Sequence, residues 1–127
     1  NLQLAFPTTF AGMPQIKAGR VRAVGVTSLK RSRSLPDTPT IDESGVRGYE
    51  VVGFYGILAP AGVPQEIVAR LNREIVKALR SPDMQERLLR DGAEPVASTS
   101  EEFRAYIAAD VGKWAKVIKT AGIRFEP

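Results

Sequence analysis

Residues 28–62 have the sequence SLKRSRSLPDTPTIDESGVRGYEVVGFYGILAPAG. This stretch connects two apolar runs that are typical of β-strands, residues 21–27 and residues 49–59. Pro36 and Pro39 exclude regular structure between the two runs. A turn and an amphipathic helical pattern follow the second run at once. This order predicts that the chain leaves one α/β lobe within residues 1–48 and enters another within residues 49–127.

The segments on either side of residues 28–62, the crossing between the two lobes, predict strands before it and helices after it. Residues 2–6 alternate as in a strand, and residues 21–27 are β-branched like a buried strand. Between them, Thr8 and Thr9 open a short helix that stops at Gly19. Beyond the crossing we expect three helices. One starts with Pro64 as its first residue, one is capped at Ser81-Pro82-Asp83 and ends at Gly92, and one runs from a capping box at Thr99 and Glu102 to Gly122.

Composition limits the possible functions. The 127 residues contain no His and no Cys, which excludes an imidazole base, a His-containing triad and thiolate metal sites. We therefore expect no enzyme, no metal and no cofactor. Residues 1–48 carry seven Lys/Arg against three Asp/Glu, whereas residues 49–127 are balanced. The positive first part favours an anionic small molecule or, less specifically, nucleic acid. The start at Asn1, directly before a strand, suggests an internal cut with a signal peptide upstream.

Two pairs of residues are candidates for ligand binding. Thr8 and Thr9 lie between a strand and a helix, where hydroxyls and free backbone N–H groups converge on an anion, although a Thr at this place is also an ordinary N-cap. Phe54 and Tyr55 lie in the second strand-like run, either as a cleft wall or as packing between lobes. The pairs Asp42/Glu43 and Glu101/Glu102 are assigned to a hydrated loop and to a first helical turn. The basic run at residues 30–33 is assigned to a solvated loop, and Trp114 to a core.

Several motifs resemble the solute-binding receptors of tripartite tricarboxylate transporters, the Bug-type family. They are IKAGRVRAVGVTS (16–28), RSxSLPDTPTIDESG (31–45), GYEV (48–51), GILAPAGVP (56–64), RLNREI (70–75), DGAEPV (91–96), SxxEEF (98–103) and KWAKVIKTAGI (113–123). They occur in collinear order over nearly the whole chain.

The resemblance implies an α/β fold of the type II periplasmic-binding-protein kind, present here in part. Residues 1–48 would end the second lobe, and residues 49–127 would complete the first with a strand and three helices. The family captures a small carboxylated solute in the periplasm and passes it to the membrane permease subunits of the transporter. Two positions depart from the family pattern: Pro7 stands where the family often has Asp, and Val63 where it tends to have Thr.

Three other functions compete with this one. A receptor-derived module could serve sensing or protein interaction without transport. A basic nucleic-acid-binding domain is disfavoured because no predicted helix carries a basic stripe, and a hydrolase because G-x-S-x-G is absent. The sequence therefore predicts a receptor part that binds a carboxylate and no nucleic acid. Apolar helix faces left without a partner make a dimer or a swapped assembly of the 127 residues a further expectation.

Overall fold

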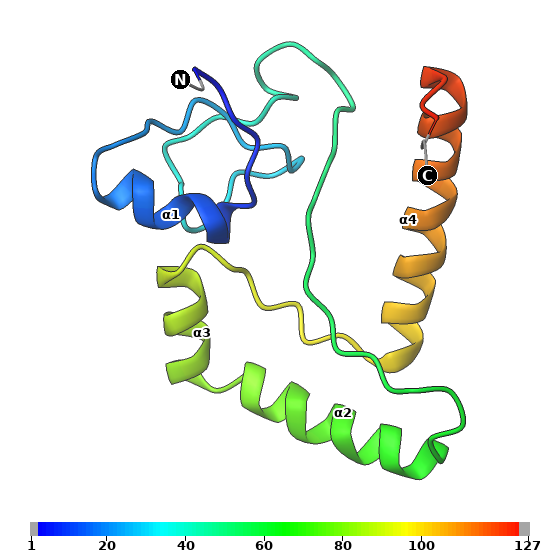
Figure 1. Ribbon diagram of the computed structural model, residues 1–127. Helices are drawn as coiled ribbons and strands as arrows, with labels where there is room; N and C mark the ends of the chain where they lie inside the picture. The colour runs from blue at the N-terminus through cyan, green and yellow to red at the C-terminus, as the bar shows by residue number, and fades with distance from the viewer. Residues whose placement is uncertain (1–2, 125–127) are drawn as a thin grey trace.

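The computed structural model describes residues 3–124, and these contain four helices. The helices are α1 (Thr9–Lys17), α2 (Gln65–Leu79), α3 (Pro82–Arg90) and α4 (Ser100–Ala121). In Figure 1 a long extended segment runs from the compact N-terminal part, which includes α1, down past α4 to α2. No helix in this part of the chain combines the length and the apolar character that a membrane span requires.

The expected strands do not form a sheet within residues 3–124. The only β-bridge recorded there is parallel and joins Val26 to Thr40. Residues 50–60 are extended, and they meet the other predicted strand at one point, where Val51 N donates to Thr27 O at 2.9 Å and Thr27 Oγ1 donates to Val51 O at 2.6 Å. An extended segment becomes a strand only when a neighbour pairs with its N–H and C=O groups. Residues 3–124 therefore contain no sheet that would display the predicted α/β fold. Leu2, the first residue of the strand predicted at 2–6, lies outside the described residues.

The helix ends follow local sequence signals, with two differences. At α4 the predicted capping box is present: Thr99 and Glu102 exchange side-chain to backbone hydrogen bonds, and Gly122 ends the helix with φ of 65°. Pro64 is the N-cap of α2 instead of its first residue. Ser81 occupies the N-cap position of α3, but its hydroxyl donates back to Ala78 O of the preceding helix and caps nothing. Both differences leave the predicted helices in place.

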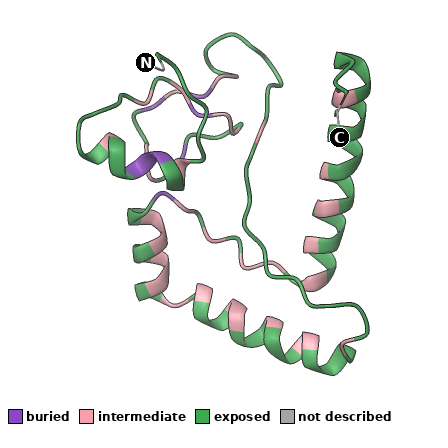
Figure 2. Ribbon diagram, in the orientation of Figure 1, coloured by how far each residue is buried: buried purple, intermediate pink, exposed green. Residues whose placement is uncertain are grey.

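Burial is concentrated in the N-terminal part of the chain. The buried residues are Gly12, Met13, Val26, Ser32, Thr38, Thr40 and Gly92, and α2, α3 and α4 contain none. Figure 2 shows this as purple confined to α1, the loops around it and the turn after α3. Apolar side chains of the extended segment are open to solvent instead, with Ile57 74% and Leu58 75% exposed. Residues 3–48 and the turn at Gly92 therefore share one small core.

The crossing loop, residues 28–48, is ordered by its own charged side chains. Arg31 Nε lies 2.9 Å from Glu43 Oε2, and Thr40 N donates to the same carboxylate at 3.0 Å. Asp42 accepts from Gly48 N at 2.7 Å and from Arg47. These carboxylates were expected in a hydrated loop, and Arg31 in a solvated basic run; all three lie in a loop and stay partly exposed, and each also holds a turn. The donated N–H of Thr40, with Arg31, lowers the pKa of Glu43, and the N–H of Gly48, with Arg47, lowers that of Asp42.

The backbone amides in this loop should report those two titrations. Because both pKa values are lower in the folded state, the contacts stabilise the fold above the usual values of 4.5 for Glu and 3.8 for Asp and are lost as pH falls through the lowered values. In NMR titrations the Thr40 amide should therefore shift with a midpoint below 4.5, and the Gly48 amide with a midpoint below 3.8. Glu43→Gln should abolish the Thr40 titration only. Midpoints at or above the usual values would contradict these contacts.

Candidate functional site

The start of α1 presents hydrogen-bond donors with no acidic side chain in its first turn. Thr8 is the N-cap: its Oγ1 accepts from Ala11 N at 3.3 Å, and its carbonyl accepts from Gly12 N at 2.9 Å. The N–H groups of Thr9 and Phe10 have no acceptor recorded among residues 3–124. The first N–H groups of a helix carry partial positive charge and favour an anion. This turn can therefore donate to a carboxylate.

Tyr55 comes from the extended segment and reaches the same place. Its hydroxyl lies 3.4 Å from Thr8 Oγ1, and its ring meets Phe10 edge-on with centroids 6.0 Å apart. The backbone of Gly53 also passes close by, because a Cβ there would lie 3.0 Å from Thr8 Cγ2. Tyr55 is nevertheless 74% exposed, so its hydroxyl remains accessible to a solute. Of the four predicted residues, the fold thus brings three together: Thr8, Thr9 and Tyr55.

Phe54 does not join them. Its ring meets Phe103 and Tyr106 of α4 edge-on, with centroids 5.7 Å and 5.0 Å apart, and burial in this cluster raises the pKa of Tyr106. Successive side chains of an extended chain point to opposite sides, so Tyr55 toward α1 directs Phe54 toward α4. Phe54 thus packs within residues 49–127, whereas the alternatives predicted for it were a cleft wall and packing between lobes. Phe10 of α1, for which no role in the site was predicted, takes the place of Phe54 beside Tyr55.

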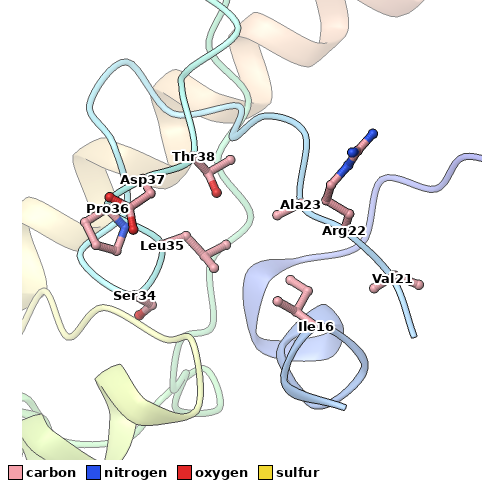
Figure 3. A pocket seen from close by; sticks show the side chains of 9 residues that line it. All are labelled: Ile16, Val21, Arg22, Ala23, Ser34, Leu35, Pro36, Asp37 and Thr38. Carbon is pink, nitrogen blue, oxygen red and sulfur yellow. The ribbon is translucent and has the colours of Figure 1, made fainter. Parts of the chain in front are cut away.

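Two hollows lie away from these residues. One of about 390 Å³ is bounded by Ile16, by residues 21–23 and by residues 34–38. Figure 3 shows Arg22 and Asp37 on opposite sides of it, with the Arg22 side chain pointing away. The other, of about 620 Å³, lies between the C-terminal half of α2 and residues 97 and 99. Neither is lined by Thr8, Thr9, Phe54 or Tyr55. Of these four residues Thr8, Phe54 and Tyr55 are exposed, and Thr9 is half-buried.

Comparison with known proteins places this chain in a family. Residues 1–123 match the family model described as the tripartite tricarboxylate transporter family receptor. The chain belongs to this receptor family. It is 42% identical over 104 residues to a UPF0065 protein from the tcbD–tcbE intergenic region of a Pseudomonas species, covering 81% of this chain and 31% of that protein. It is 32% identical over 116 residues to protein BugT of Bordetella pertussis, covering 91% and 36%.

Solved structures have a similar backbone arrangement over most of this chain. The R. palustris protein Rpa4515 with adipate superposes with a TM-score of 0.83 at 38% identity, covering 91% of this chain and 38% of that one. The periplasmic binding protein BugD gives 0.79 at 39% identity, covering 91% and 39%. The predicted family is therefore confirmed, and the neighbours agree with part of a periplasmic binding fold. The chain spans about a third of the length of the curated relatives it matches.

Proposed function

We propose that these 127 residues are the C-terminal part of a periplasmic receptor that captures a small carboxylate. The observation that carries the proposal is the meeting of Thr8, the open N–H groups at the start of α1 and the Tyr55 hydroxyl on one surface. These groups carry no formal charge at neutral pH, and Pro7 stands beside them in place of an acid. The surface therefore suits a negatively charged group and offers no carboxylate to pair with an amine.

Binding would exchange the hydration of a carboxylate for fixed protein donors. The N–H groups of Thr9 and Phe10 would donate to its oxygens, and so would one of the two hydroxyls of Thr8 and Tyr55, because the contact between them uses the hydrogen of the other. Hydrogen bonds to an ionised group contribute about 1.5–3 kcal/mol each, more than neutral ones. Lobe closure would then remove water and strengthen them. No side chain in this arrangement acts as nucleophile or base, so the proposed role is capture without catalysis.

The rest of the receptor would supply the opposite wall of the site. In this proposal residues 1–48 end one lobe and residues 49–127 complete the other, behind an upstream segment that includes a signal peptide. Expressed alone, the 127 residues would leave the apolar side chains of residues 57 and 58 uncovered, and we expect them to associate as dimers or larger assemblies. The complete receptor would deliver its solute to the permease subunits of a membrane transporter.

Calorimetric titration of the complete receptor tests the class of solute. We expect saturable binding of at least one compound in a series of succinate, glutarate, adipate, pimelate and citrate. Hexamethylenediamine and hexanediol match adipate in length but carry the opposite charge or none. The best carboxylate should bind at least about 100-fold more tightly than either, because two charge-assisted hydrogen bonds exceed the 2.7 kcal/mol that this ratio requires. Equal binding of the diamine or the diol, or binding of no carboxylate, would contradict the proposal.

A further inference from the structure

Residues 89–94, the last turn of α3 and the turn after it, are fastened to the crossing loop. Glu94 Oε1 accepts two hydrogen bonds of 2.8 Å, one from Ser32 Oγ and one from Arg33 N. Ser34 Oγ donates to Leu89 O, also at 2.8 Å. Ser32 is buried, with 8% of its surface exposed. A buried hydroxyl is costly to leave without a partner, so the contact with Glu94 fixes the two segments together.

The same residues hold both ends of α1. At its first turn the backbone of Gly92 lies against Thr9, so closely that a Cβ on Gly92 would be 2.9 Å from Thr9 O. At its last turn the Lys17 ammonium donates to Arg90 O. Gly92 and Met13 of α1 are both buried. Segment 89–94 therefore contacts α1 at both ends, although it belongs to a distant part of the sequence.

Local interactions fix the conformation of α1 but not its place in the molecule. The Thr8 cap orders the first turn wherever the helix lies, because donor and acceptor are three residues apart. The direction in which the N–H groups of Thr9 and Phe10 point depends instead on what the helix rests upon. Gly92 supports the first turn directly, and Glu94, two residues later, fixes Gly92 to the crossing loop.

We propose that Glu94 is a positioning residue for the solute surface at the start of α1, an inference that rests on the proposed function. By accepting from Ser32 and Arg33, its carboxylate keeps Gly92 against Thr9 and so sets the orientation of the open N–H groups. An acceptor oxygen is required for this role, and a negative charge is not. Glu94→Gln should therefore retain the role, while Glu94→Ala should lose it.

Hydrogen exchange in the ligand-free complete receptor tests the inference without any solute. In Glu94→Ala the amides of Ala11 and Gly12 should exchange roughly tenfold faster, because the first turn of α1 loses its support. Glu94→Gln should exchange at the wild-type rate. Glu86→Ala, which removes an exposed carboxylate from α3, serves as the matched control and should also leave these amides unchanged. With adipate as the probe, Glu94→Ala should weaken the affinity about fivefold and Glu94→Gln less than twofold.

Each outcome separates this inference from the proposed function. Unchanged exchange at Ala11 and Gly12 in Glu94→Ala would overturn it, as would a Gln variant that behaves like the Ala variant. If Glu94→Ala does not fold, Ser32→Ala removes one of the two donors and must show the same effect in smaller measure, or the inference fails. If the wild-type receptor shows no preference for carboxylates, the proposed function fails. The exchange rates would still decide the role of Glu94.

Discussion

Gly92→Ala is expected to lower the free energy of unfolding by about 3 kcal/mol, the sum of a backbone penalty and a steric one. Gly92 has φ of 87°, a conformation that L side chains rarely adopt. The new Cβ would also lie 2.9 Å from Thr9 O, 3.0 Å from Thr9 C and 3.1 Å from Met13 Cε. Two of these atoms are backbone and cannot rotate away, so α1 or the turn itself must shift.

Gly62→Ala separates the two contributions. Gly62 has φ of 86°, nearly the same as Gly92, but no atom lies within 4 Å of a Cβ built there. It should therefore show the backbone penalty alone, about 1 kcal/mol. Urea-induced unfolding of the complete receptor measures both variants against wild type. Equal losses for Gly92→Ala and Gly62→Ala would show that Gly92 is not pressed against α1.

Gly56→Ala is expected to cost about 2 kcal/mol, within the range for overpacking a filled site. Its Cβ would lie far inside the contact distance of Phe103 Cζ and 2.7 Å from Phe103 Cε1. The Phe103 ring also packs against Phe54, so it cannot turn aside without breaking that contact. The extended segment and α4 would have to separate.

Two further variants test this explanation. Gly112→Ala lies in the middle of α4 with open space around it, and it should stabilise the protein by up to about 1 kcal/mol because Ala favours a helix. In a Phe103→Ala background the cost of Gly56→Ala should nearly vanish, since the clashing ring is gone. A cost that persists in this background would place the origin of the effect elsewhere.

Local signals predicted that the helices form and where α4 begins and ends, although Ser81 caps nothing and Pro64 precedes its helix. The Thr99–Glu102 capping box and the stop at Gly122 lie within a few residues of the helix ends that they control, and both were predicted. Strand pairing depends instead on distant partners. Residues 49–58 have the composition of a strand, yet the described residues offer this run two hydrogen bonds to Thr27 and no ladder. A pattern of residues can show that a segment is ready to pair, but it does not supply the partner.

The candidate site shows the same division. The position of Thr8 at a helix start predicted its capping hydrogen bond, because cap and helix are contiguous. For Phe54 and Tyr55 the alternation of an extended chain put one residue on each side, but the sequence did not say which side faces α1. The contact of Glu94 with Ser32 joins residues 62 positions apart, and no motif foretold it. The family resemblance, together with the donors at the start of α1, carries the proposed solute class.

Titration of the best-binding carboxylate into the complete receptor that carries Thr8→Ala and Thr9→Ala together tests the proposed solute site most directly. The Thr8 hydroxyl caps the first turn and lies beside Tyr55, so its loss weakens both the donors and their alignment. We predict an affinity at least about tenfold lower than that of the wild type, which corresponds to 1.4 kcal/mol. Unchanged affinity, with the wild-type heat of binding, would show that the solute is held elsewhere.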